Sequence, residues 1–303
     1  MMHPPLPVRP LQSIAAATDL SEPARLACER AAQLARQHGA RLTLVHMVTL
    51  GLLDRLRLMA ADDAEQLDTM LVGALKADVQ LLADELAAQR HVAAEVVVGR
   101  QPLLAGLLAE VRSAAAELLV LGPQGAGHVR HAVLGTTAER LVGRSPVPVL
   151  IARQANPTPY RQVLVPVDFS PASQAAVAAA RQLAPGAQLV LLHAFQVPFE
   201  GKMRLAGVEE SQLVRYELHA RQTAHDQMQA LLTACGLDAT MAGVSTVVAH
   251  GEPTRLILAY AEETGADLIV VGKGEASALE DMLLGSVTRH VLVEAEIDVL
   301  VAG

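Results

Sequence analysis

The chain has 303 residues, of which 51% are hydrophobic and 2% aromatic, with no Trp and a formal net charge of -8. This length allows two domains of ordinary size, and a composition rich in Ala, Leu and Val favours an α/β fold in which helices cover buried parallel strands. The negative charge argues against a protein that mainly covers nucleic-acid phosphates.

No apolar run reaches membrane-spanning length, and the proline-rich residues 1–10 lack the apolar core of a secretory signal. The two cysteines, Cys28 and Cys235, lie one in each half within expected helices, which indicates neither a disulfide framework nor a cysteine metal site. We therefore expect a cytoplasmic protein that does not associate with membranes.

In the first half, short blocks rich in Val, Leu and Ile alternate with helix-period segments, which predicts alternating strands and helices. The expected strands start at Ser13 (SIAAA), Leu42 (LTLVHMV), Glu95 (EVVV), Leu118 (LLVL) and Pro146 (PVPVLI). Leucines and a valine at three- and four-residue steps across 67–86 predict a helix whose apolar stripe faces the core.

The second half repeats these blocks in the same order at an offset close to 150 residues. The repeat superimposes Asp19 on Asp168 and His46 on His193. Its expected strands lie in VLVPV from Val163, LVLLHAF from Leu189, VVAH from Val247, LIVV from Leu268 and IDVLV from Ile297. We predict two tandem, doubly wound, parallel five-stranded sheets with strand order 3-2-1-4-5, each flanked by helices.

The two copies should form domains 1–153 and 161–303, joined by a short stiff linker over 154–160 that contains two prolines. In the predicted order the fifth strand is an apolar sheet edge, which can pair with another strand. We expect the fifth strands of the two copies to face each other as an intramolecular pseudo-dimer. The chain could pair further into a homodimer.

In a doubly wound sheet, ligands bind beyond the carboxyl ends of the strands, where the strand order reverses. Asp19 ends the first strand, and the glycine loop Gly122-Pro123-Gln124-Gly125 follows the fourth. Gly135, Thr136 and Thr137 begin the next helix, where free backbone N–H groups and the helix dipole favour phosphate oxygens. These segments should line one crevice.

The spacing Gly-two-residues-Gly-nine-residues-Gly-Ser/Thr in the first copy resembles the nucleotide-binding members of the universal stress protein family, and the five repeated blocks extend the resemblance over nearly the whole chain. The resemblance implies an adenine nucleotide, ATP or else AMP or ADP, with Mg²⁺. It places adenine on the Met47 backbone, Asp19 near the ribose or base, and the phosphates on the glycines. The implied nucleotide-binding residues are Ala17, Thr18, Asp19, Met47, Leu121, Gly122, Gly125, Gly135, Thr136 and Thr137.

The second copy departs from this pattern because Glu275 replaces the second glycine, next to Glu280 and Asp281. Carboxylates near phosphates oppose binding, so we expect a weaker site or none there. The first copy carries His128, Arg130 and His131 in the same stretch, as phosphate contacts or as solvated loop residues. The second-copy candidates are Pro166, Val167, Asp168, Ala194, Gly272, Gly274, Gly285, Ser286 and Val287.

Structural roles compete with these assignments. Asp19 and Asp168 could simply cap the following helices. His46 and His193 end buried strands without a neighbouring ligand cluster, which favours core histidines over catalysts or metal ligands. No catalytic residue is assigned.

Known enzyme motifs are missing from the sequence. A Rossmann fingerprint would follow the first strand, where the chain has Ala-Thr-Asp and Pro-Val-Asp, and no P-loop occurs. We therefore expect a nucleotide-binding sensor or regulator of the stress response, with slow or no hydrolysis and a regulatory protein partner. The alternative is a scaffold of the same fold that binds no nucleotide.

Overall fold

The computed structural model describes residues 9–48, 64–125, 134–155, 157–238, 240–274 and 284–303. The described chain divides into two compact units. The first unit spans Pro10–Pro159, and the second contains Tyr160–Gly303 together with Arg9. The contacts thus group most of the expected linker with the first unit, while the exact domain limits stay a prediction.

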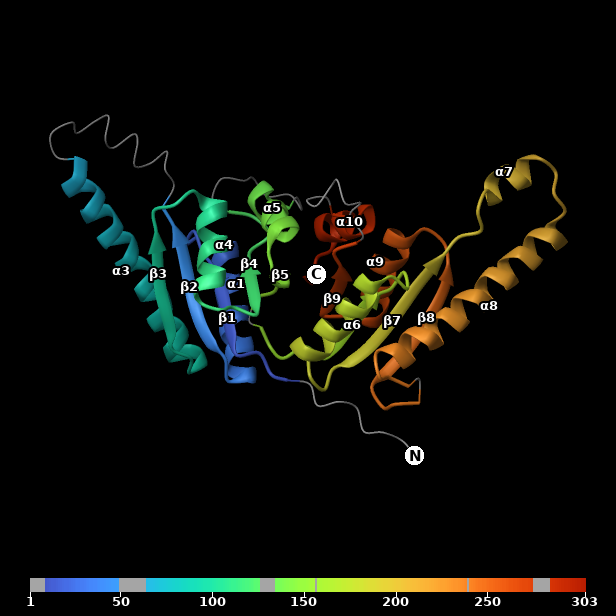
Figure 1. Cartoon of the computed structure of the whole chain (residues 1–303), viewed down its shortest axis with the longest axis horizontal. Coiled ribbons are helices and arrows are strands. Elements are labelled where there is room, and N and C mark those ends of the chain that lie inside the picture. Colours follow the sequence, from blue (N-terminus) through green and yellow to red (C-terminus); the bar gives the residue numbers. More distant parts are fainter. Residues whose placement is uncertain (1–8, 49–63, 126–133, 156, 239, 275–283) are drawn as a thin grey trace. The chain divides into compact units, whose positions relative to one another are not determined.

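The first unit is a parallel sheet of five strands in the order β3-β2-β1-β4-β5 (Figure 1). Its elements are β1 (Ser13–Ala17), α1 (Glu22–His38), β2 (Arg41–Met47), α3 (Ala64–Arg90), β3 (Ala94–Gly99), α4 (Leu103–Ser113), β4 (Leu118–Leu121), α5 (Thr136–Arg144) and β5 (Val149–Ile151).

The second unit has the same parallel topology, β8-β7-β6-β9-β10. Its elements are β6 (Gln162–Pro166), α6 (Pro171–Leu183), β7 (Gln188–Phe195), α7 (Glu200–Leu205), α8 (Glu210–Ala234), β8 (Val244–His250), α9 (Pro253–Thr264), β9 (Leu268–Gly272), α10 (Ser286–Glu294) and β10 (Asp298–Ala302). The α/β class and the predicted order 3-2-1-4-5 are confirmed in both units.

The predicted apolar stripe lies on α3, and the helix continues for three or four residues beyond the stripe at each end. Val79, Leu82 and Leu86 are buried against the sheet, whereas Leu75 is half-buried. The central strand β1 is buried along almost its whole length, as expected for a parallel strand covered on both faces.

A tight turn joins the first strand to the first helix in both units. Leu20 has φ 65° and Phe169 has φ 67°, so a non-glycine residue adopts the left-handed region at the same place in each copy. Such a conformation is uncommon and needs support from its surroundings. The turn takes four residues in each unit, so the first helix begins close to the carboxyl end of the first strand.

Two arginines of the first unit hold the segment before residue 160. Arg30 of α1 is 1% exposed and donates to the Thr158 carbonyl (2.6 Å) and to Gln154 Oε1 (3.3 Å). Arg90, at the end of α3, donates to the Pro157 carbonyl (3.4 Å). The segment therefore lies against the first unit through hydrogen bonds from charged groups, which are stronger than neutral ones.

Tyr160 fixes the start of the second unit. Its ring is 5% exposed, and its hydroxyl donates to Asp298 Oδ2 of β10 over 2.6 Å. Asp298 is fully buried. A buried carboxylate requires such donors, because an unsatisfied charged group in the interior costs more than a neutral one.

We predict that Tyr160→Phe lowers the free energy of unfolding of the second unit by about 1–3 kcal/mol, since Asp298 loses a buried donor while the ring stays in place. Urea unfolding of the full chain, followed by circular dichroism, measures the change. Tyr216→Phe is the matched control, because Tyr216 is 50% exposed. Equal effects of the two substitutions would contradict the prediction.

Candidate functional site

A cavity of about 510 Å³ lies at the carboxyl ends of the strands of the first unit, and we call it the first cavity. It is reached by the ends of β1, β2 and β4 and by the start of α5. All ten residues predicted for the first copy line it: Ala17, Thr18, Asp19, Met47, Leu121, Gly122, Gly125, Gly135, Thr136 and Thr137. The structure thus brings together residues up to 120 positions apart, whereas their role in binding stays a prediction.

Gly122 is required by packing between helix and strand. A Cβ atom on this residue would lie 2.8 Å from the Pro23 carbonyl oxygen in the first turn of α1. The same contact recurs in the second unit, where a Cβ atom on Gly272 would lie 2.7 Å from the Ala172 carbonyl oxygen. The resemblance assigned Gly122 to the phosphates, whereas the structure gives a packing reason for glycine at this position, the close approach of α1.

The two glycine segments of the first cavity meet through a backbone hydrogen bond from Gly135 N–H to the Pro123 carbonyl (2.8 Å). Gly135 is the N-cap of α5 and supplies no side-chain cap. The first N–H groups of a helix have no partner within the helix. The start of α5 therefore presents backbone donors and the positive end of the helix dipole to the cavity.

Asp19 both supports the turn and faces the glycine loop. Its Oδ1 accepts hydrogen bonds from the Ser21 backbone N–H (3.1 Å) and the Ser21 hydroxyl. A Cβ atom on Gly125 would lie 2.6 Å from Asp19 Oδ2, so only glycine leaves this carboxylate its place. Ser21, and not Asp19, is the N-cap of α1, so the capping alternative for Asp19 is wrong. One oxygen of Asp19 supports the turn, and the other lies at the glycine loop.

The histidine of the second strand has a structural role. His46 is 8% exposed, and its Nδ1 donates to the Thr18 carbonyl over 2.8 Å. His193 makes the equivalent bond to the Val167 carbonyl over 2.8 Å. In each unit this bond ties the second strand to the residue that follows the first strand. His46 is buried, as expected of a core histidine, whereas His193 is half-buried.

Sequence reasoning missed the apolar wall of the first cavity. Leu75 of α3 and Leu103 and Leu107 of α4 all line it. Leu75 belongs to the predicted α3 stripe, and its place in the half of α3 nearest the cavity was the signal that could have identified it as a lining residue. No signal of that kind marks the leucines of α4, which read as ordinary core positions.

Cys28, in α1, is fully buried. Burial raises the pKa of its thiol to about 12, although a hydrogen bond with Thr18 acts in the opposite direction. A protonated thiol is a weak nucleophile, so Cys28 packs as a small apolar side chain.

A second cavity, of about 420 Å³, occupies the equivalent place in the second unit. All nine residues predicted for the second copy line it: Pro166, Val167, Asp168, Ala194, Gly272, Gly274, Gly285, Ser286 and Val287. Three residues that carry the predicted difference between the copies, Glu275, Glu280 and Asp281, lie outside the described residues, as do His128, Arg130 and His131 of the first copy.

Three hydrogen bonds hold the carboxylate in the wall of the second cavity. Asp168 Oδ1 accepts from the Ser170 N–H and hydroxyl and from the Ser173 hydroxyl. Partial burial raises the pKa of Asp168, but the hydrogen bonds from Ser170 and Ser173 outweigh it, and the pKa is lowered overall. In the first copy the position of Ser173 is taken by Ala24.

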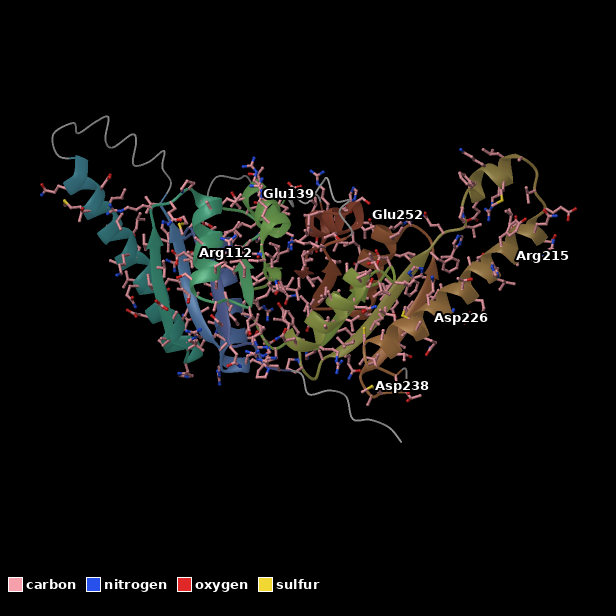
Figure 2. All side chains as sticks on the ribbon, in the orientation of Figure 1. Arg112, Glu139, Arg215, Asp226, Asp238 and Glu252 are labelled. Carbon is pink, nitrogen blue, oxygen red and sulfur yellow. The ribbon has the colours of Figure 1, made fainter. Side chains whose placement is uncertain are left out.

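The helices that follow the third strands also begin differently. Glu252 is the N-cap of α9 and accepts hydrogen bonds from the N–H groups of Thr254 and Arg255, and Figure 2 labels it at the start of this helix. These two backbone hydrogen bonds lower the pKa of Glu252. Pro102, the N-cap of α4, has no side-chain cap.

We predict that Ser173→Ala raises the pKa of Asp168 toward the ordinary value of about 3.9. A lowered pKa in the folded state stabilises the fold above the unfolded-state pKa, and this stabilisation is lost as the pH falls through the folded-state value. The variant should therefore begin to unfold at a higher pH than the wild type.

Carboxyl-carbon NMR titration gives the pKa of Asp168, and circular dichroism follows acid unfolding. Ser211→Ala, at an exposed serine of α8, is the control. An Asp168 pKa that is the same in wild type and Ser173→Ala would show that Ser173 does not stabilise the carboxylate.

Among the residues that the structure describes, no group of three or more His, Cys, Asp or Glu side chains is placed to hold a metal ion. None of the described helices is both long enough and apolar enough to cross a membrane.

Comparison with known proteins identifies the family. The model of the universal stress protein family matches residues 10–153 and again residues 159–303. The chain belongs to the universal stress protein family. The double match shows a tandem member, as the repeat predicted.

Universal stress protein Rv2005c of Mycobacterium tuberculosis is 32% identical over 194 residues, and the match covers 62% of each chain. The chain thus spans less than two thirds of the length of this relative. A universal stress protein from Archaeoglobus fulgidus resembles the structure at TM-score 0.61 and 20% identity, covering 96% of this chain and 97% of that one, which shows the shared fold. A universal stress protein solved in complex with cAMP is similar over 48% of this chain and 98% of that chain, at 24% identity and TM-score 0.31.

Proposed function

We propose that this universal stress protein is an ATP-binding sensor or regulator of the stress response, with its principal site in the first cavity. One observation carries the proposal. Ten residues chosen from the sequence pattern, on segments far apart in the chain, line a single cavity of about 510 Å³. Small-molecule sites have volumes of this order and combine apolar walls with a few polar groups.

The two ends of the first cavity suit the two ends of a nucleotide. Gly135 and the first turn of α5 offer backbone N–H groups to phosphate oxygens. The leucines of α3 and α4 and the Met47 side chain offer an apolar surface to a base. Asp19, between them, can accept hydrogen bonds from ribose hydroxyls, and Mg²⁺ would enter with the phosphates.

We infer that the second cavity binds nucleotide more weakly. It is smaller, at about 420 Å³, and Val287 replaces the hydroxyl of Thr137 at the start of the helix. In the sequence between Gly274 and Gly285, the carboxylates of Glu275, Glu280 and Asp281 would repel phosphates. This difference remains a prediction.

Gly135→Val in the full chain should weaken ATP binding by at least about tenfold, because a branched side chain would occupy the space of the phosphates. The fold should persist, since Gly135 has φ -64° and its nearest neighbour to an added Cβ, the Pro123 carbonyl oxygen, would be 3.4 Å away. Gly122 is unsuitable for this test, because its substitution would disturb α1. Titration calorimetry with ATP, ADP, AMP and cAMP measures the effect.

Gly285→Val is the matched control, because Gly285 is the N-cap of α10 at the equivalent place in the second unit. It should leave the tighter binding event intact. If Gly285→Val abolishes that event and Gly135→Val does not, the second cavity is the principal site. Undiminished affinity in both variants would place the nucleotide elsewhere.

A scaffold that binds no nucleotide is the competing function. The complete glycine spacing in the first copy, together with the cavity it lines, favours the nucleotide site. Protein purified from cells and analysed for bound nucleotide separates the two functions, since a scaffold would carry none and would show no measurable ATP affinity.

Hydrolysis of ATP should be slower than about 1 per second, the lower end of ordinary enzymes. Asp19 is the carboxylate in the described wall of the first cavity, and in the proposed site it binds the ribose, so the described wall offers no further carboxylate to activate a water. Phosphate release measured at saturating ATP and Mg²⁺ tests this expectation. Faster turnover, lost in Asp19→Asn, would make the protein an ATPase.

The pairing of the fifth strands, the homodimer, the regulatory protein partner and the cytoplasmic location stay predictions. Cross-linking between cysteines introduced at Leu150 and Leu300, combined with light scattering, tests the first two of these together.

A further inference from the structure

The side chain of Met47 occupies a slot between two glycines. A Cβ atom on Gly99 of β3 would lie 2.5 Å from Met47 Sδ, and a Cβ atom on Gly106 of α4 would lie 2.6 Å from the same sulfur. Real Cβ atoms do not approach other atoms so closely, so any larger residue at either position would displace the thioether. Met47 is 5% exposed and also lines the first cavity.

The slot lies between the sheet and α4 and borders the first cavity. Gly99 is paired with Met47 in the sheet, and Gly106 faces β2 from α4, which packs on this strand (Figure 1). Because the sheet and the helix close two sides, a displaced Met47 side chain has room in the first cavity. Methionine has three rotatable side-chain bonds and adapts easily to such a change.

The second unit builds the same region in the reverse way. The strand register pairs Ala194 with Ala249 where the first unit pairs Met47 with Gly99. Leu107 and Ile257 line the two cavities from equivalent positions of α4 and α9, which puts Leu256 at the place of Gly106. In the first unit a long side chain, that of Met47, stands opposite two glycines. In the second unit the short side chain of Ala194 stands opposite an alanine and a leucine.

We propose that Met47, held in the slot of Gly99 and Gly106, determines which base the first cavity accepts. The inference rests on the proposed nucleotide site. The thioether forms the wall against which a flat bicyclic ring packs, and sulfur–aromatic contacts of this kind are favourable. A smaller pyrimidine ring makes less of this contact, so the wall selects purine nucleotides. The second cavity lacks the thioether and makes no such selection.

Two single variants and their combination, made in the full chain, test this mechanism. Gly106→Ala should push the thioether into the cavity and weaken ATP binding about tenfold or more. Met47→Ala should weaken ATP binding severalfold and lower the ratio of ATP to CTP affinity. In Met47→Ala/Gly106→Ala the added methyl group meets no sulfur, so ATP affinity should return to that of Met47→Ala alone.

Gly73→Ala is the matched control, because Gly73 is a helical glycine with no atom within 4 Å of an added Cβ. Thermal unfolding shows whether each variant is folded at the temperature of titration. Binding of inorganic triphosphate, which lacks the base, should be the same in all variants.

Losses that simply add in the double variant would overturn the proposal, because they would mean that Gly106 acts independently of Met47. An ATP-to-CTP affinity ratio that is the same in Met47→Ala and wild type would overturn it as well. In either case, ATP binding by the wild-type chain would leave the proposed function standing. A wild-type chain that binds no nucleotide would overturn both.

Discussion

The close approach of the first helix to the end of the fourth strand organises both units. In each unit a glycine stands at the end of that strand, Gly122 just after β4 and Gly272 as the last residue of β9. A Cβ atom added to either glycine would lie only 2.8 Å or 2.7 Å, respectively, from a carbonyl oxygen in the first turn of the first helix. This contact brings the first helix down onto the loop that carries the remaining glycines. A larger residue would separate helix and loop, and the crevice at the strand ends would lose its shape.

A second constraint sets the other side of the crevice. The histidine of the second strand donates to a carbonyl just beyond the first strand, and the next two residues form the tight turn with Leu20 or Phe169 in the left-handed region. Backbone contacts thus fix the same frame in both units. The side chains that line it differ, as with Met47 and Ala194. A duplicated chain can therefore keep one architecture while its two cavities change in size and lining.

Much of this arrangement was predictable from the sequence. The repeat and the alternating blocks gave the fold and strand order, since βαβ connections in a parallel sheet have few allowed topologies. The glycine spacing placed residues such as Asp19 and Gly135 around one cavity. The apolar wall was not predictable, because Leu103 and Leu107 follow the pattern of any buried helix face. The slot around Met47 depends on three-dimensional proximity between Gly99 and Gly106, which no local pattern records.

The segment expected to be the linker is anchored at both ends by hydrogen bonds from buried side chains, besides the restriction that its prolines impose. Arg30 holds the Thr158 carbonyl within the first unit, and Tyr160 is anchored to Asp298 within the second. Between these anchored residues stands Pro159, whose φ is restricted by its ring. Arg30 lies two turns beyond the part of α1 that packs on Gly122, so one helix contacts both the candidate site and the linker. The candidate site and the segment before residue 160 are therefore built against opposite parts of one continuous helix, so the packing of α1 positions both.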